Sequence, residues 1–512
     1  MLEKIKKPTV LILLDGFGIA PESEENLLSK KILPNFYFFS KEYPATTLYS
    51  AGRQIGSSDD EKGNSIAGHL NIGAGRLCYS TREKIDRAIT DKTFFENKIL
   101  LKSIEFLQKN NSNLHLAGFL GIDKQFSDEK HLLSLLEFYK NVSKKKIFLH
   151  IFLDTENTMD ENNKKILENF LAKIKNNHNV ILASLSGKNF AMDMDRHWDR
   201  TEKVYKTICN SSDIESFDLK NILADFSLLE KSPIKIKQVQ YNFNKNDLIF
   251  FFNHSSVGMR QLTKAFALPS FTKFPIIFDH LENLVITLTE YDKELPALVA
   301  FPKFFIYNSL TETLSKNKFK QLHLAGPEKF SHVTYYFNGK INDAFENETD
   351  EMVKLSITGD YNEYLRKTTK TTTNKIIKNI NNDNFDFYLA NYSILDLTAD
   401  FVSDKEKIKK NILLLDKQIK KIADYCLAKD GTLFISSSYV KKELLGINVV
   451  ETIPFLIIKN SLRGKKIVKN DSINGDLSLV YPSGNLADIA PTILTELQIE
   501  IPKEMTGKSL LN

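Results

Sequence analysis

Short, continuous apolar runs alternate along the whole chain with segments whose apolar residues recur at helical spacing, such as 131–142 and 162–176. The runs are rich in β-branched and aromatic residues, which suits strands buried on both faces of a sheet. This alternation predicts an α/β protein with largely parallel sheets. The expected strands span 9–15, 113–120, 146–154, 179–187, 247–253, 281–288, 385–392 and 431–438.

Several of these runs end in a polar or small residue, among them Asp15, Asp154, Asn253 and Ser438. In open α/β sheets ligands bind outside the carboxyl ends of the strands. We therefore expect any chemistry of the chain at these strand ends. The polar stretch 367–384 is interpreted as a surface helix with loops and carries no functional signal.

Length and charge exclude several classes of protein. A chain of 512 residues favours two or more domains over a single core. Lys+Arg 69 against Asp+Glu 64 gives a net charge of only +5, without the basic stripe of a nucleic-acid-binding protein. No stretch approaches the roughly 20 apolar residues of a membrane span. The three cysteines are far apart and lack metal-ligand spacing, so we expect a cytoplasmic protein.

Six motifs then occur in a fixed order. They are LLDGFG (13–18), GNSIAGHLNIGAGR (63–76), AMDMDRHWDR (191–200), RQLTKAF (260–266), EKFSHVTYYFNG (328–339) and LADIAPTILTELQIEIPKEMTGKSLL (486–511). Together they resemble the cofactor-independent phosphoglycerate mutases of the alkaline phosphatase superfamily, over essentially the whole chain. The resemblance implies a phosphatase-like domain formed by 1–78 plus 304–512, with an inserted phosphotransferase-like α/β domain at 79–303.

The resemblance also implies a mechanism. In that family two manganese ions activate a serine, which takes the phosphoryl group from one end of phosphoglycerate. The inserted domain holds the glycerate until the group is returned to the other hydroxyl. By this resemblance Asp15 and Ser65 occupy the positions of an aspartate metal ligand and of the nucleophile. Lys329 matches the phosphate-contacting lysine, and Asp396 matches another metal-binding aspartate.

The remaining metal ligands of the family pattern are absent. The histidine expected four residues after Asp396 is Asp400. The other replaced ligand positions are Ser438, Tyr439 and Asn448, where the family has an Asp-His pair and a third histidine. Carboxylates suit Mg or Mn, so a single such ion at Asp396 and Asp400 stays open as an alternative. We otherwise expect no cofactor.

The substrate positions of the inserted domain also depart from the family. The acid/base histidine is replaced by Phe126, and an Arg-Asp pair by Glu156 and Asn157. The remaining arginine positions are Lys188, Met194, Ser255 and Gly258, of which only Lys188 keeps the charge. Each charge-assisted hydrogen bond contributes roughly 1.5–3 kcal/mol, so four lost arginines forfeit on the order of 6–12 kcal/mol.

These losses lead us to expect a non-catalytic, phosphoglycerate-mutase-like protein with a structural or scaffolding role. Its partners would be unidentified proteins, in a larger assembly, with Ser65 and Lys329 as vestigial positions. Three alternatives stay open. They are a residual metal-dependent phosphatase or phosphoryl-transfer enzyme, a ligand sensor without turnover, and the active phosphoglycerate mutase that homology alone suggests.

Overall fold

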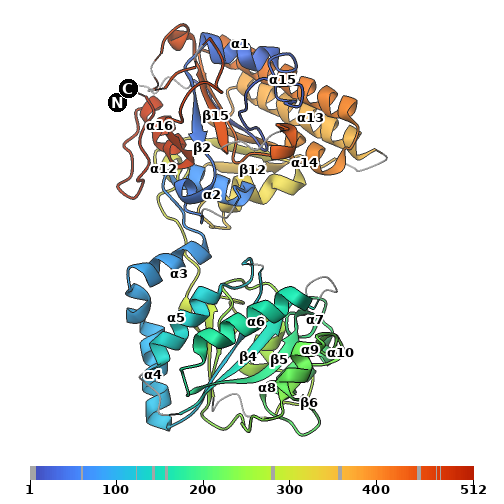
Figure 1. Ribbon diagram of the computed structural model, residues 1–512. Coiled ribbons are helices and arrows are strands. Elements are labelled where there is room, and N and C mark those ends of the chain that lie inside the picture. Colours follow the sequence, from blue (N-terminus) through green and yellow to red (C-terminus); the bar gives the residue numbers. More distant parts are fainter. Residues whose placement is uncertain are drawn as a thin grey trace. The chain divides into compact units, whose positions relative to one another are not determined.

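The chain forms two compact units, Met1–Ser80 with Phe304–Asn512, and Thr81–Lys303 (Figure 1). In each unit a sheet of mainly parallel strands is covered by helices, so the predicted two-domain α/β fold is confirmed. The computed structural model describes residues 7–58, 62–122, 124–140, 145–155, 160–277, 283–355, 360–446, 451–466, 468, 470–472 and 474–511.

The first unit is built on an eight-stranded sheet within the described residues. Its strands are, in spatial order, β12 (Glu348–Met352), β11 (Gln321–Ala325), β13 (Phe387–Tyr392), β1 (Thr9–Leu14), β14 (Thr432–Ser436), β15 (Thr452–Ile458), β2 (Ala45–Tyr49) and β16 (Gly484–Asn485). The first five run parallel, and β15 is antiparallel to both of its neighbours. Every residue of β1 is buried, as expected for a strand covered on both faces.

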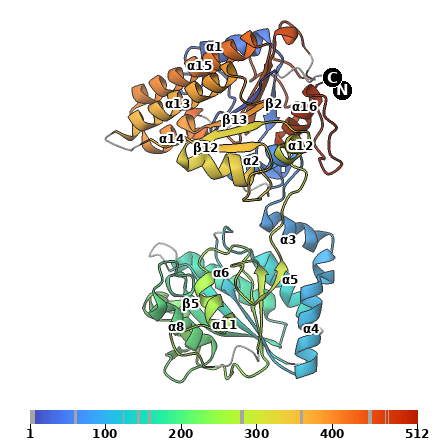
Figure 2. The ribbon, with the colours of Figure 1, turned by 180° about the vertical axis from the view of Figure 1, so that it is seen from behind.

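Helices cover both faces of this sheet (Figures 1 and 2). One group consists of α1 (Pro34–Glu42), α13 (Tyr361–Asn381), α14 (Ile394–Phe401) and α15 (Lys405–Ala428). The other consists of α2 (Ser65–Ala74), α12 (Leu310–Lys316) and α16 (Ile489–Glu496). Apolar residues of both groups and of the sheet form one continuous core.

The second unit has its own eight-stranded sheet within the described residues. The spatial order is β10 (Leu298–Phe301), β9 (Leu284–Thr289), β8 (Leu248–Phe251), β3 (Leu114–Phe119), β4 (Ile147–Leu153), β5 (Val180–Gly187), β7 (Ile234–Ile236) and β6 (Ser216–Phe217). The strands from β10 to β5 are parallel, and β7 is antiparallel to β5.

Two separate cores lie on the two faces of the second sheet. The larger includes residues of α3 (Thr81–Thr90), α4 (Lys98–Asn110), α5 (Glu129–Tyr139), α6 (Asp160–Ile174), α9 (Leu219–Ala224) and α10 (Ser227–Lys231). The other includes residues of α7 (Lys188–Ala191), α8 (Trp198–Ile208) and α11 (Arg260–Ala267).

Each of the eight strands expected from the sequence is present, although residues 281–282 of one run lie outside the described residues. The interpretation of 367–384 as a surface segment needs correction. It forms most of α13, whose buried face includes four threonines, Thr368, Thr369, Thr372 and Thr373. The hydroxyls of Thr369, Thr372 and Thr373 each bond the carbonyl one turn back, which lets most of this polar face pack inward. None of the described helices is both long and apolar enough to cross a bilayer.

Candidate functional site

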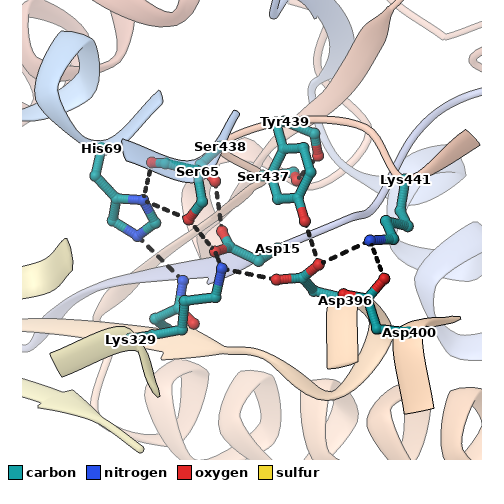
Figure 3. A network of polar contacts seen from close by, with 11 residues as sticks. Asp15, Ser65, His69, Lys329, Asp396, Asp400, Ser437, Ser438, Tyr439 and Lys441 are labelled. Carbon is teal, nitrogen blue, oxygen red and sulfur yellow. Dashed lines mark hydrogen bonds and ion pairs between the residues drawn. The ribbon is translucent and has the colours of Figure 1, made fainter. Parts of the chain in front are cut away.

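Four adjacent parallel strands of the first unit, β11, β13, β1 and β14, end at the same edge of the sheet. Asp15 follows β1 directly, and Ser438 lies just after β14. Asp396 lies in the first turn of α14, which follows β13, and Lys329 ends the short helix 327–329 after β11. Segments far apart in the sequence thus bring four polar side chains to one place, as Figure 3 shows.

Ser65 reaches this edge from α2, of which it is the first residue. The Asn64 side chain caps the helix by accepting a hydrogen bond from the Ala67 backbone N–H at 2.9 Å. The helix lies close to the sheet because residue 68 is glycine. A Cβ there would be 2.1 Å from the Ser438 carbonyl oxygen. As a result the Ser65 hydroxyl donates a hydrogen bond to Asp15 Oδ2 at 2.5 Å.

Asp15 is fully buried, and both of its carboxylate oxygens are engaged. Ser438 donates to Oδ1 at 2.5 Å, and the Lys329 ammonium lies 3.1 Å from Oδ2. Burial by itself raises the pKa of Asp15, but the Lys329 ammonium and the two hydroxyl donors lower it by more, so the pKa falls below its usual value. Asp15 is therefore an ionised carboxylate at neutral pH.

Lys329 joins Asp15 to the second carboxylate of the cluster. Its ammonium is 2.7 Å from Asp396 Oδ2, and the lysine is 7% exposed. Burial lowers the pKa of Lys329, but the two carboxylates raise it more, so the pKa lies above its ordinary value. The Tyr439 hydroxyl donates to Asp396 Oδ1, and burial together with that carboxylate raises the tyrosine pKa.

Lys441 is a further member of the site, and the sequence analysis missed it. Its ammonium lies 2.5 Å from Asp400 Oδ1 and 3.6 Å from Asp396 Oδ1. Its backbone N–H donates to the carbonyl oxygen of Gly16 at 3.1 Å, which fixes the lysine next to the Asp15 segment. One signal in the sequence could have indicated it, because Lys441 lies three residues after Ser438, the polar end of the expected strand 431–438.

His69, four residues after Ser65 on α2, is buried within the same cluster. Its Nδ1 lies 2.7 Å from the Ser65 carbonyl oxygen, and the Asn391 amide donates to its Nε2 at 3.0 Å. These partners place the imidazole hydrogen on Nδ1. Burial lowers the pKa of His69, so the ring is neutral. With Nε2 occupied by Asn391, the ring supports the position of Ser65 and does not accept its proton.

The donor set of this cluster does not fit the two divalent ions that the family resemblance implies. The oxygens of Asp15 and Asp396 are occupied by hydroxyl donors and ammonium groups. A divalent ion about 4 Å from the Lys329 ammonium would meet a repulsion of roughly 8 kcal/mol at an effective dielectric constant of about 20. Asn448, the third altered ligand position, lies outside the described residues.

Other groups of the chain could bind a metal, so the expectation of no cofactor is not supported. Two such groups occur among the described residues, Asp193, Asp195 and His197 in the second unit, and His323, Glu348 and Asp350 in the first. Neither group includes Asp15, Asp396 or Asp400.

In the second unit, three of the altered substrate positions lie together. The Lys188 ammonium pairs with Asp154 at 2.9 Å and lies 5.8 Å from the centre of the Phe126 ring. The Ser255 backbone N–H donates to the Phe126 carbonyl oxygen at 3.1 Å. Glu156 and Asn157 lie outside the described residues.

The other two altered positions, Met194 and Gly258, line a cavity of about 660 Å³ within the second unit. Gly258 has φ +73°, and a Cβ there would lie 2.6 Å from the Met192 carbonyl oxygen. An arginine at residue 258 would thus need a different backbone. However, Arg196 and Arg260, each two residues further along, line the same cavity. Neither arginine stands at a position where the family pattern expects one, so neither was predicted as a substrate ligand from the sequence.

Comparison with a solved structure and a family model supports the fold. The structure of Leishmania mexicana phosphoglycerate mutase, solved at low cobalt concentration, has a TM-score of 0.65 and 19% sequence identity. The match covers 100% of this chain and 99% of that one. The family model described as BPG-independent PGAM N-terminus matches residues 85–293.

Curated relatives extend the similarity to the whole chain. The 2,3-bisphosphoglycerate-independent phosphoglycerate mutases of Clostridium botulinum and Clostridium acetobutylicum are each 32% identical, with 99% of both chains covered. This full-length similarity to curated enzymes contradicts the expectation of a non-catalytic scaffold and of a protein that is not an enzyme, and nothing in it supports a catalytically dead paralogue. The prediction of protein partners stays a prediction. The chain belongs to the family of BPG-independent phosphoglycerate mutases.

Proposed function

We propose that the protein interconverts 2-phosphoglycerate and 3-phosphoglycerate by phosphoryl transfer through Ser65. The full-length similarity to curated phosphoglycerate mutases supports this function. The observation that carries it is the Ser65 hydroxyl, which donates at 2.5 Å to the buried Asp15 carboxylate beside the Lys329 ammonium. A serine with a charged acceptor and a neighbouring cation has the elements of an activated nucleophile.

In the first half-reaction, the bond between Ser65 Oγ and phosphorus forms while the phosphorus–oxygen bond to the glycerate breaks. The serine proton passes to Asp15 Oδ2, and the departing glycerate oxygen takes a proton from water. The second half-reaction reverses these steps at the other hydroxyl. Phosphoryl transfer passes through a loose transition state in most analyses, so catalysis depends mainly on positioning and electrostatics. This suits Asp15, whose low pKa makes it a weak base.

Two features stabilise the negative charge of the phosphoryl group. Ser65 is the first residue of α2, a helix of ten residues, and a helix N-terminus presents backbone N–H groups and a partial positive charge. Lys329 supplies a full charge, with its ammonium 3.1 Å from the acceptor of the serine proton. In a buried site these charges act at a lower effective dielectric constant than in water.

The cavity of the second unit would hold the anionic glycerate. Arg196, Arg260 and Lys264 line it, and arginine binds carboxylate or phosphate through two parallel hydrogen bonds. Arg260 is oriented by the hydrogen bond from its Nε to the Tyr291 carbonyl oxygen at 3.1 Å. A cytoplasmic location belongs to the same proposal, because the three free cysteines suit a reducing compartment.

Phosphorus NMR of the purified full chain with 3-phosphoglycerate tests the proposal. We expect the resonance of 2-phosphoglycerate to appear and Ser65→Ala to slow its appearance by at least about 1,000-fold, because the nucleophile is lost. Ser436→Ala is the matched control. It removes a buried hydroxyl of the same sheet edge that bonds the Pro454 carbonyl oxygen, so turnover should persist.

Two outcomes would refute the mutase proposal. Release of inorganic phosphate without the isomer would identify a phosphatase instead. Unchanged 3-phosphoglycerate with a folded protein, over a range of enzyme concentrations, would remove the proposed activity altogether.

A further inference from the structure

Two lysine ammonium groups lie within the carboxylate cluster of the first unit, where the family resemblance implies two metal ions. We propose that Lys329 and Lys441 supply the positive charge of this site as fixed ammonium groups, and that Ser65 acts there without a resident metal ion. The inference rests on the proposed phosphoryl transfer for its chemistry. Its statement about metal binding can be tested without turnover.

The oxygen atoms that a metal would use are already engaged by other groups. Asp15 Oδ1 accepts from Ser438, and Asp15 Oδ2 from Ser65, with Lys329 beside it. Asp396 Oδ2 pairs with Lys329, and its Oδ1 accepts from Tyr439 (Figure 3). A divalent ion can therefore bind these carboxylates only by displacing hydrogen-bond donors that already neutralise or solvate them.

The hydroxyl groups of Ser438 and Tyr439 act as hydrogen-bond donors to the carboxylates. The family resemblance implies an aspartate and a histidine at these two positions, both of which offer lone pairs to a cation. The hydroxyls instead donate their hydrogens to Asp15 and Asp396. They compete with a cation for the same carboxylate oxygens and add no charge to attract one.

Lys441 is held in place through both its backbone and its side chain. Its backbone N–H bonds to the Gly16 carbonyl oxygen, and the neighbouring residue Val440 forms a bridge with Gly16. Its side chain is 16% exposed and lies between Asp400 and Asp396. Because both its backbone and its ammonium are anchored, Lys441 is a built part of the site and not a passing surface contact.

The ammonium groups also have a direct use in the proposed reaction. A lysine ammonium offers three N–H donors, and charge-assisted hydrogen bonds to phosphate oxygens are among the strong ones. Lys329 and Lys441 each pair with two carboxylates, so either can turn one donor toward a phosphoryl group while keeping its other contacts. They then neutralise part of its charge, a role that metal ions fill in phosphoryl-transfer enzymes generally.

Metal analysis of variants tests the inference at this site alone, because other groups of the chain could bind an ion. The full chain is incubated with MnCl₂, freed of unbound ion and analysed by mass spectrometry. We expect the same manganese content in the wild type and in Asp396→Asn. A content that falls in Asp396→Asn would overturn the inference, since it would place a manganese ion at Asp396.

A second variant, Lys441→Ala, tests whether the Lys441 ammonium prevents a metal ion from binding at Asp396 and Asp400. Lys441→Ala frees Asp400 and one side of Asp396, so we expect manganese affinity at this site to rise by at least about tenfold and added MnCl₂ to raise its Tm. Lys442→Ala is the matched control. That neighbouring lysine pairs with Glu451 at 2.9 Å, away from the cluster, so its manganese content should equal that of the wild type. An equal manganese content in the wild type, Lys441→Ala and Lys442→Ala would contradict the proposed role of Lys441.

A turnover assay in the presence of a chelator completes the test. It uses the wild-type protein, so its result does not depend on whether a variant folds. We expect phosphoglycerate interconversion to continue in excess EDTA at a rate within about twofold of the untreated enzyme, since Ser65 acts with lysine charges. Activity that EDTA abolishes and manganese restores would overturn this inference and leave the mutase function intact. Failure of turnover in every condition, with manganese content still independent of Asp396, would instead refute the proposed function alone.

Discussion

Replacing Lys329 with methionine would show how strongly the buried cluster depends on its central ammonium. Methionine keeps an unbranched chain of similar length but removes the charge. The substitution leaves Asp15, which is fully buried, and Asp396, which is 5% exposed, without their shared cation. We expect the first unit to lose stability and the second unit to be unaffected.

The magnitude follows from the two distances. At an effective dielectric constant of about 20, a separation of 2.7 Å corresponds to about 6 kcal/mol of attraction, and 3.1 Å to about 5 kcal/mol. The cost of removing an ammonium from water, several kcal/mol, offsets part of this gain. Removing one partner of a buried pair typically costs 3–5 kcal/mol because the other charge stays buried. We expect a loss of about 3–5 kcal/mol in the unfolding free energy of the first unit.

Native-state amide exchange measures this loss for the first unit separately. The amides of the paired strands β1 and β13 should exchange roughly 100 to 10,000 times faster, since 1.36 kcal/mol corresponds to a factor of ten. Trp198, the single tryptophan, lies in the second unit, so the fluorescence-detected transition of that unit should not move.

The matched control is Lys367→Met on α13 of the same unit. Lys367 pairs with Glu363 at 2.8 Å, but both side chains are more than half exposed, so the loss should stay within about 0.5 kcal/mol. A loss below about 1 kcal/mol in Lys329→Met, equal to that of an exposed pair, would refute the claim that this ammonium neutralises the buried carboxylates.

Two further predictions concern substrate binding and pH. Arg260→Gln should raise KM for 3-phosphoglycerate with little change in kcat, because it removes a contact that binds the glycerate and takes no part in bond formation at Ser65; an unchanged KM in steady-state assays would exclude the cavity as the glycerate site. Burial, together with the nearby Lys329 ammonium, lowers the pKa of His332 to about 3 from its ordinary value of 6.5. The unfolded chain therefore takes up this proton first, and the stability contribution is complete above about pH 6.5 and lost as pH falls toward 3. In the wild type, the free energy of unfolding of the first unit, measured with urea, should decrease between pH 7 and pH 4. The decrease should be smaller in His332→Phe, and a decrease as large as that of the wild type would contradict the lowered pKa of His332.

Much of the fold was predictable from local patterns, because buried parallel strands are continuous apolar runs. The run 9–15 became β1, and its final residue, Asp15, stands at the strand end where ligands of such sheets bind. The inward face of α13 was not predictable in the same way. Its threonines are polar residues in the sequence, but the hydroxyls of Thr369, Thr372 and Thr373 bond carbonyls of the preceding turn, so the methyl groups can pack inward.

Site residues were predictable from the sequence only at positions where the family pattern expects a functional side chain. The motifs named Asp15, Ser65 and Lys329, which the structure brings into contact, whereas Lys441 has no counterpart among the expected ligands. Its role depends on the backbone contact with Gly16, which joins segments more than 400 residues apart in the chain. No window of sequence contains that contact, so local reasoning could not have found it.

The same limit explains why the expectation of a non-catalytic protein was wrong. It counted arginines and histidines position by position and treated each loss as independent. Gly258 cannot carry a side chain in its present conformation, yet Arg260 lines the same cavity two residues later.

Asp400 adds a negative charge where a neutral histidine was expected, and the Lys441 ammonium lies 2.5 Å away to offset it. Asp400 is itself exposed, but Asp15 and Asp396 beside it are buried, and an uncompensated buried ion costs several kcal/mol. A substitution at one ligand position is therefore interpretable only together with the cations and hydroxyl donors that the fold places around it.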